Sequence, residues 1–196
     1  FTFIASAHAL KWQGIQPIFC DIDPHTHNLD PEKVEALISP NTTGILGVHV
    51  WGRPCAIEHL EKIASKHKLR LFFDAAHAFS SSYHGKMIGN FGDLEVFSFH
   101  ATKFFNTFEG GAITTNNDEL ASRIRFMANF GFENYDTVNY LGTNAKMTEI
   151  SAAMGLTGLR SLEAFVKVNH DNYRLYKENF EKIDGVQLVE YDEEEN

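Results

Sequence analysis

Hydrophobic and polar positions alternate along the chain between helical and strand-like spacing. Helical spacing predicts helices at residues 3–13, 29–38, 56–68 and 118–131, of which 56–68 is clearly amphipathic. Short apolar runs bounded by polar residues or glycine predict strands at residues 16–23, 42–50, 69–74, 94–99 and 111–116. From about Met147 to Lys182 the pattern becomes that of long helix, with possible breaks at Gly155 and Gly158.

Two of the helices carry further local signals. At 29–38, Asp30 is placed to cap the helix, Pro31 occupies the first helical position, and Leu37 and Ile38 are expected to face inward. At 56–68 one apolar stripe is formed by Ile57, Leu60, Ile63 and Ala64.

Strands that are apolar on both faces and separated by helices indicate βαβ units. The sequence therefore predicts an α/β fold with a mostly parallel sheet and helices on both faces, in three α/β/α layers.

Polar residues gather where three of the predicted strands end. They are His49 and Trp51 at the end of the strand 42–50, Asp74 at the end of 69–74, and Ser98, His100 and Lys103 at and beyond the end of 94–99. In an open parallel sheet ligands bind beyond the carboxyl ends of the strands. These residues are therefore the first candidates for a functional site.

Asp74 and Lys103 together suggest a particular cofactor. A lysine amine can form a Schiff base with an aldehyde. If the aldehyde belongs to pyridoxal phosphate (PLP), a carboxylate is needed to keep the ring nitrogen protonated. Ser98 can supply a hydroxyl to the phosphate. The alternative is that Asp74 caps a helix and Lys103 is a surface residue whose charged end reaches solvent.

Composition and charge narrow the class of protein. Apolar residues make up 43% and charged residues 22% of the 196 positions, which is ordinary for a globular protein. A formal charge of −9 argues against nucleic acid as a partner, because nucleic-acid binding relies on a basic face. No apolar run is long enough for a membrane helix. Cys20 and Cys55 are expected to be reduced thiols in a cytoplasmic protein.

A longer stretch resembles a known family. The motifs are Asp-Ala-Ala-His-Ala at 74–78, Gly-Asn-Phe-Gly-Asp at 89–93, Ser-Phe-x-x-x-Lys at 98–103 and Glu-Gly-Gly at 109–111. In this order they resemble the PLP-dependent sugar aminotransferases of the DegT type (DegT/DnrJ/StrS), which have the fold-type I architecture. The similarity continues through "FTFIASAHAL" at the start and "LGTNAKMTEI" later.

The resemblance implies a role for each matching residue. Lys103 resembles the lysine that holds PLP covalently as an internal aldimine and then moves the substrate proton, and Asp74 looks like the partner of the pyridine nitrogen. The other implied cofactor-binding residues are His77 at the phenolic oxygen or ring face, Ser98 at the phosphate, Phe3 stacked on the ring, and Asn144 reaching the phosphate of a dimer partner.

Structural alternatives remain open for these residues. Phe3 can be a core residue, Ser98 can cap the following turn, and Asn144 can satisfy a local turn. His77 can be a packed histidine. For the neighbouring His100, Asn106 and Glu109, contact with substrate and stabilisation of the loop are both open. The spacing of His25 and His27 does not suffice for a metal site, and no metal is expected.

The resemblance also implies the activity and the organisation of the protein. It predicts transfer of an amino group, from glutamate, to a nucleotide-linked keto-deoxysugar, as in the biosynthesis of polysaccharides such as lipopolysaccharide, by a cytoplasmic homodimer. The alternatives are a non-catalytic or regulatory PLP-binding domain and a PLP-dependent keto-sugar dehydratase, whose relatives have histidine in place of the lysine. Residues 1–146 would be a PLP-binding large domain incomplete at its N-terminus. Residues 147–196 would be a long helix and the start of an incomplete C-terminal small domain.

Overall fold

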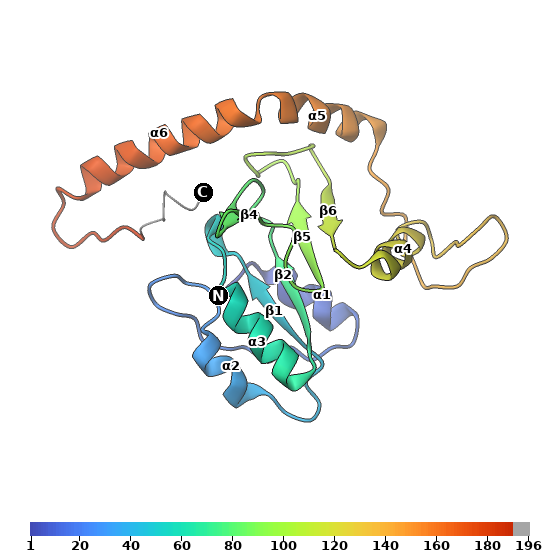
Figure 1. Ribbon diagram of the computed structural model, residues 1–196. Coiled ribbons are helices and arrows are strands. Elements are labelled where there is room, and N and C mark those ends of the chain that lie inside the picture. Colours follow the sequence, from blue (N-terminus) through green and yellow to red (C-terminus); the bar gives the residue numbers. More distant parts are fainter. Residues whose placement is uncertain (190–196) are drawn as a thin grey trace. The chain divides into compact units, whose positions relative to one another are not determined.

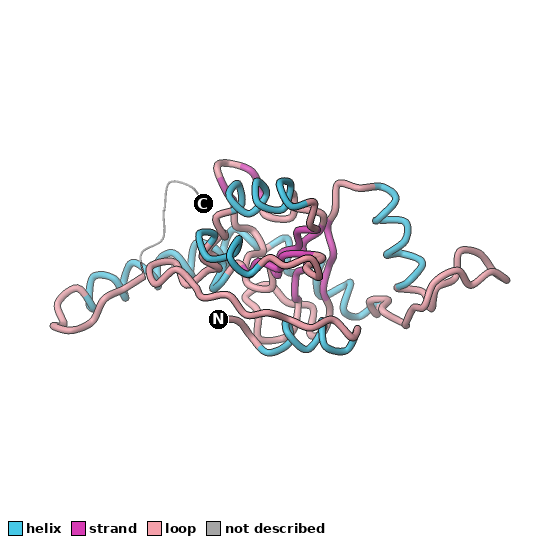
Figure 2. Tube along the Cα trace, turned by 90° about the horizontal axis from the view of Figure 1, so that it is seen from below, coloured by secondary structure: helices cyan, strands magenta, loops and turns pink. Residues whose placement is uncertain are grey.

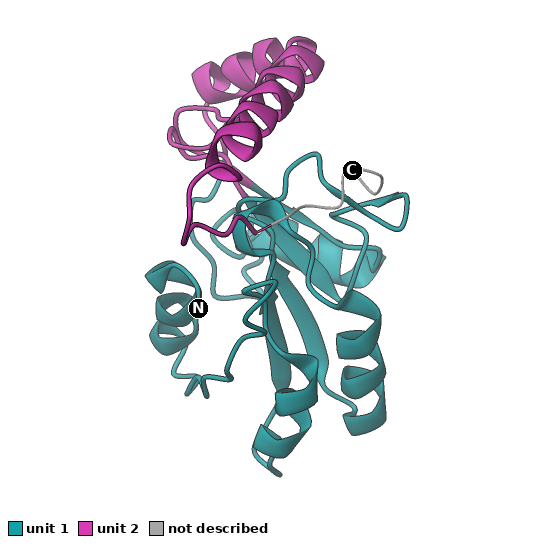
Figure 3. Ribbon diagram, turned by 90° about the vertical axis from the view of Figure 1, so that its left-hand side faces the viewer, with its two compact units in different colours: residues 1–97, 112–146, 195–196 teal, residues 98–111, 147–194 magenta. Residues whose placement is uncertain are grey.

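The computed structural model describes residues 1–189 and divides into two compact units (Figure 3). Within the described residues, the first unit comprises 1–97 and 112–146, and the second comprises 98–111 and 147–189. The large and small domains expected of a longer protein stay a prediction. The end of the second predicted domain, residues 190–196, lies outside the described residues.

The first unit is built on a four-stranded sheet with the order β1-β2-β5-β6 (Figure 1). The strands are β1 (Gly44–Val48), β2 (Arg70–Asp74), β5 (Leu94–Ser98) and β6 (Gly111–Thr114). β1 pairs with β2, and β2 pairs with β5, both in parallel. The register aligns Val48 with Asp74 and Asp74 with Val96. A separate antiparallel hairpin consists of β3 (Ser82–Tyr83) and β4 (Lys86–Met87).

Helices cover both faces of this sheet. The helices of the first unit are α1 (Ile4–Trp12), α2 (Pro31–Leu37), α3 (Ile57–His67), α4 (Asp118–Met127) and a short 3-10 turn, η1 (Val50–Gly52). Figures 1 and 2 show α1, near the N-terminus, on the opposite face of the sheet from α3. The predicted α/β fold with a mainly parallel sheet between helices is thereby confirmed.

The core between α3 and the sheet follows the predicted apolar stripe. Ile57 and Leu60 are fully buried and Ala64 is nearly so, while Ile63 is half-buried. They share this core with the fully buried Phe73 of β2. Each large apolar side chain buried in this way contributes about 1.5–3 kcal/mol. The burial fixes α3 on β1 and β2, the two strands that lead to the polar residues at the sheet edge.

Two local expectations are wrong. Residues 16–23 do not form a strand: their pairing is an isolated bridge between Ile22 and Leu29, and Ile18 and Phe19 are exposed. A strand is stabilised by a ladder of backbone hydrogen bonds, which one bridge does not provide.

In α2 the cap is as expected, since the Asp30 side chain accepts from the Glu32 N–H. Val34 is the buried residue of this helix, whereas Leu37 is exposed.

The second unit contains α5 (Glu149–Arg160) and α6 (Leu162–Phe180), separated at Ser161. Gly155 and Gly158 do not break α5. A Cβ at Gly155 would lie 2.9 Å from Thr107 Cγ2, and one at Gly158 would lie 3.2 Å from the Phe105 ring. These glycines let α5 approach the 98–111 segment closely.

Two findings bear on the class of protein. None of the helices within residues 1–189 combines the length and apolar character needed to cross a membrane. Cys20 and Cys55 are both free thiols, as the sequence predicts. Desolvation in the core raises the pKa of the Cys55 thiol from 9.0 to about 12, so this thiol is uncharged at neutral pH.

Candidate functional site

Three neighbouring strands bring their polar ends to one edge of the sheet. β2 ends at Asp74, β5 ends at Ser98, and His49 directly follows β1. Because the three strands are parallel, their carboxyl ends share an edge. This is the edge at which ligands bind in open α/β sheets. The structure thus brings together the strand ends that the sequence marked as polar.

The Asp74 carboxylate is held by donors on both oxygens. The Ser6 hydroxyl of α1 donates to Oδ2 at 2.6 Å, and the Ala76 N–H donates to Oδ1 at 3.0 Å. Ser6 is buried, and its oxygen lies 2.8 Å from the Thr2 hydroxyl. A carboxylate has about four lone-pair positions, so both oxygens keep capacity for another donor. The side chain is fixed in direction and can still accept a further hydrogen bond.

The backbone around Asp74 is fixed from both neighbouring strands. The His49 N–H donates to the Asp74 carbonyl at 3.0 Å, and the Ala75 N–H donates to the Val96 carbonyl at 2.8 Å. These bonds continue the sheet beyond the last residue of β2. The end of β2 is therefore held on both sides at the residue that carries the carboxylate.

Lys103 lies in a turn of the second unit, and hydrogen bonds to neighbouring residues fix its backbone. Its N–H donates to the His100 carbonyl at 2.9 Å, and its carbonyl accepts from the Asn106 side-chain amide at 3.2 Å. The side chain is half-buried. Within residues 1–189 its ammonium has no hydrogen-bond or ion-pair partner. Asn106 thus stabilises the turn, and its contact with substrate stays a prediction.

Other polar residues of the same turn bond to one another. Ser98 Oγ accepts from the His100 N–H at 3.3 Å, so the Ser98 hydroxyl proton can be donated elsewhere. The His100 ring contacts the Thr102 hydroxyl at 2.9 Å and the Glu109 carboxylate at 3.5 Å. His100 and Glu109 are both exposed. In the described chain these two side chains form a solvent-facing pair.

The remaining predicted site residues belong to the first unit. His77 is exposed in the turn after β2. Phe3 is the N-cap residue of α1 and is 75% exposed, which rules out the alternative of a core residue in this chain. Asn144 is exposed and forms an isolated bridge with Asn129. The roles assigned to these three residues by resemblance stay predictions.

Trp51 and His27 form an aromatic contact close to the end of β1. Their ring centroids are 5.1 Å apart, and Phe1 approaches both rings. Trp51 and His27 adopt positive φ angles of 55° and 60°, which are uncommon for residues other than glycine. Among residues 1–189 no group of three or more potential metal ligands is found.

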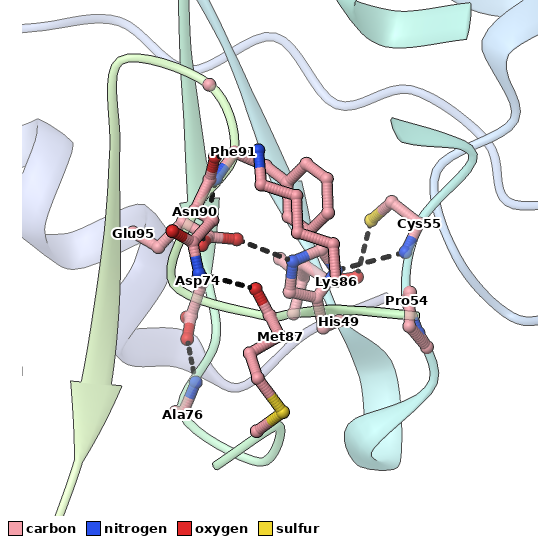
Figure 4. A network of polar contacts seen from close by, with 12 residues as sticks. His49, Pro54, Cys55, Asp74, Ala76, Lys86, Met87, Asn90, Phe91 and Glu95 are labelled. Carbon is pink, nitrogen blue, oxygen red and sulfur yellow. Dashed lines mark hydrogen bonds and ion pairs between the residues drawn. The ribbon is translucent and has the colours of Figure 1, made fainter. Parts of the chain in front are cut away.

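The sequence did not identify Ser6 or Glu95 as members of the site. Ser6 resembles any small helix residue, and only the fold brings it to Asp74, 68 positions away. Glu95 had a signal: it is a charged residue inside the apolar run 94–99 and is completely buried. Figure 4 shows its carboxylate bonded to His49.

The chemistry of these residues fits pyridoxal phosphate. Asp74 offers an oriented carboxylate with free acceptor capacity for a protonated ring nitrogen. Lys103 offers an amine that no described side chain engages, and Ser98 offers a hydroxyl proton. An amine that no described side chain engages is available for covalent attachment to an aldehyde.

Comparison with known proteins gives a consistent result. The DegT/DnrJ/EryC1/StrS aminotransferase family matches residues 1–196. A dTDP-4-amino-4,6-dideoxy-D-glucose transaminase of Shigella dysenteriae is 40% identical over 189 residues, covering 96% of this chain and 52% of that protein. A GDP-perosamine synthase of Caulobacter vibrioides is 40% identical over 164 residues, covering 83% of this chain and 44% of that protein.

A solved structure extends the likeness to three dimensions. The structure of DesI in the presence of its TDP-sugar product matches with a TM-score of 0.90 and 50% sequence identity. The match covers 95% of this chain and 47% of the DesI chain. The chain thus spans about half the length of the relatives that it matches.

Proposed function

Because the chain belongs to the DegT/DnrJ/EryC1/StrS aminotransferase family, we propose that the intact protein is a PLP-dependent aminotransferase. The amino group is transferred from glutamate to the keto group of a nucleotide-linked deoxysugar. The observations that support this most directly concern the two residues with the main roles, one in each unit. Asp74 is oriented by two donors, and Lys103 lies on an ordered turn without a polar partner in the described chain.

Each site residue has a defined task in this proposal. When bound, pyridoxal phosphate supplies an aldehyde that links to an amine and a ring that withdraws electrons from the substrate α-carbon. Lys103 would hold the cofactor and would then move the proton at the substrate α-carbon. Asp74 would accept the hydrogen bond of the protonated ring nitrogen. Ser98 would hold the phosphate, Phe3 would stack on the ring, and His77 would bind the phenolic oxygen or the ring face.

The proposal includes a cytoplasmic homodimer. Asn144 would reach the phosphate bound by the partner subunit, and its exposure in this chain leaves it accessible for such a contact. The substrate class is supported by the relatives, two of which carry a nucleotide-linked sugar in their names. Biosynthesis of a surface polysaccharide is the process in which we place this activity.

The first experiment tests the half-reaction with the amino donor. The intact protein is loaded with pyridoxal phosphate and mixed with glutamate, and the cofactor absorbance and 2-oxoglutarate are followed. We expect the aldehyde form of the cofactor to convert to the amine form with one equivalent of 2-oxoglutarate per site. An unchanged spectrum would instead support a non-catalytic PLP-binding domain.

The second experiment tests what happens to the sugar. Keto-deoxysugar nucleotides are added to the protein in its amine form, and the products are analysed by mass spectrometry. We expect a product in which an amino group has replaced the keto oxygen. Loss of water without gain of nitrogen would identify a dehydratase and contradict the proposal. The presence of lysine at position 103 favours the aminotransferase.

A further inference from the structure

A polar pair that the proposed mechanism does not use lies buried in the first unit. His49 and Glu95 have side chains with no exposed surface, and their Nε2 and Oε1 atoms are 3.2 Å apart (Figure 4). His49 directly follows β1, and Glu95 is the second residue of β5. Charged residues are almost never buried completely unless they are paired. The pair therefore needs a physical explanation.

The surrounding donors determine how the His49 ring is protonated. The Cys55 N–H donates to His49 Nδ1 at 3.0 Å, so this nitrogen carries no hydrogen. The hydrogen of a neutral ring then resides on Nε2, which donates to Glu95 Oε1. The other oxygen, Glu95 Oε2, accepts from the Phe91 N–H at 3.3 Å. Every polar atom of the two side chains is thereby used, and the ring is held in one tautomer.

Three contacts connect this pair to the end of β2. The His49 N–H donates to the Asp74 carbonyl. The His49 ring stacks on Phe73, with centroids 4.8 Å apart and an interplanar angle of 17°. Phe73 is in register with Glu95 across the parallel pair of strands. The pair thus holds Phe73 and Asp74, the last two residues of the strand.

The pair and the Asp74 carboxylate lie on opposite faces of the sheet. Successive side chains of a strand point to opposite faces. Phe73 packs with His49 and Glu95, whereas the Asp74 carboxylate meets Ser6 of α1. Any influence of the pair on the carboxylate therefore acts through the backbone of β2.

Stability alone is a weak explanation for the pair. Replacing both partners of a buried hydrogen bond with apolar groups of the same shape is often nearly neutral or stabilising. Directional hydrogen bonds fix the position and register of a strand more precisely than apolar packing does. Asp74 requires this kind of precision, since its carboxylate must meet one ring atom.

We propose that His49 and Glu95 are a positioning pair that fixes the end of β2 and thereby aims the Asp74 carboxylate at the ring nitrogen of the cofactor. The inference rests on the proposed function, in which Asp74 is the partner of that nitrogen. His49 and Glu95 themselves touch neither cofactor nor substrate in this assignment.

The test uses Glu95→Gln in the intact protein. A glutamine can still accept from His49, but its amide group then faces the Phe91 N–H, so one donor loses its acceptor. The protein is loaded with pyridoxal phosphate labelled with 15N in the ring. We expect the ring-nitrogen chemical shift to move toward its unprotonated value. The rate of the glutamate half-reaction is expected to fall about 10-fold to 100-fold, as is typical when a residue that orients a functional group is changed, with little change in KM.

A second variant and a matched control separate positioning from simple loss of stability. His49→Gln keeps a donor for Glu95 but loses the ring that stacks on Phe73 and accepts from Cys55, and it tests the pair if Glu95→Gln does not fold. Leu60→Ala removes fully buried volume from the same core without touching these hydrogen bonds. We expect it to lower Tm and leave the nitrogen signal unchanged.

The outcomes distinguish this inference from the proposed function. If Asp74→Asn changes the nitrogen signal but Glu95→Gln and His49→Gln leave both signal and rate as in the wild type, the positioning role is wrong. If Leu60→Ala shifts the signal as much as Glu95→Gln does, the pair is merely structural. If Asp74→Asn itself has no effect on the signal, the assignment of Asp74 fails and the positioning role fails with it.

Discussion

The end of β2 and the turn that carries Lys103 are organised in opposite ways. At Asp74 both the backbone and the side chain are held, the side chain by Ser6 and by the Ala76 N–H. At Lys103 the backbone is held equally well, but the ammonium has no polar partner within residues 1–189. One region fixes a functional group, and the other fixes only the chain that presents it.

The difference follows from the two tasks proposed for these residues. A carboxylate that pairs with a ring nitrogen works best when its direction is set before the cofactor arrives. A lysine that must first bind the cofactor and then carry a proton has to move between positions. A strong ion pair would hinder that movement and would keep the amine charged. The contrast between a fixed acid and an amine that no described residue engages is therefore consistent with the proposed chemistry.

The largest effect is expected from Lys103→Ala. Removing the amine should abolish the covalent link to pyridoxal phosphate and reduce transamination to background, while folding is preserved because the turn depends on backbone contacts. The measurement is mass spectrometry after borohydride reduction of the loaded protein. Lys62→Ala, which changes an exposed lysine of α3, is the control and should keep the adduct. An adduct that persists in Lys103→Ala would show that another lysine holds the cofactor.

A smaller loss is expected from Ser6→Ala. The Asp74 carboxylate then loses its donor at Oδ2, and a hydrogen bond to a charged group contributes about 1.5–3 kcal/mol. We expect the rate of the glutamate half-reaction to fall about 10-fold to 100-fold, with the Lys103 adduct still formed. Thr2→Ala, which removes the hydroxyl next to Ser6, should have a weaker effect. If both variants react at the wild-type rate, the fixed orientation of Asp74 is not needed.

Asp74 and its contact with Ser6 also illustrate how much of the site the sequence can predict. The strands ending at Asp74 and Ser98 could be predicted because apolar runs and their polar ends are local features. The contact between Ser6 and Asp74 could not, since nothing local links a small residue of a helix to a strand 68 positions away. The isolated run at 16–23 was mistaken for a strand because local propensity does not reveal whether a partner strand is present. Gly155 and Gly158 looked like helix breaks, although they are sites of close packing.

The turn that carries Lys103 can be tested through its contact with α5. In Gly155→Ala the new methyl group would lie 2.9 Å from Thr107 Cγ2. Thr107 is 2% exposed, and its hydroxyl donates to the Glu109 carbonyl, so it has little room to move. We expect a loss of stability of about 1–2 kcal/mol, partly offset by the better helix propensity of alanine.

A double variant isolates the steric cause of this loss. Thr107→Ser removes the methyl group and keeps the hydroxyl, so adding Gly155→Ala to Thr107→Ser should cost nothing or stabilise the protein. Urea unfolding of the two single variants and the double variant gives the coupling energy directly. Equal effects of Gly155→Ala in both backgrounds would contradict the packing explanation.

The smallest expected effect concerns the stability contributed by the buried Cys55 thiol, and it appears only at high pH. Burial raises the pKa of the Cys55 thiol from 9.0 to about 12. Well below pH 9 the thiol is neutral in both folded and unfolded protein. Between pH 9 and 12 the unfolded thiol ionises while the folded thiol stays protonated, so the free energy of unfolding falls as pH rises.

Cys55→Ser retains a donor for the Val48 carbonyl, which the thiol contacts at 3.0 Å, and does not titrate in this range. Urea unfolding from pH 8 to 11 should therefore show a steeper loss for the wild type than for Cys55→Ser. Parallel curves would mean that the folded thiol ionises like the unfolded one because water reaches Cys55. The core beside the end of β2 would then be less rigid than the hydrogen bonds of His49 and Glu95 suggest.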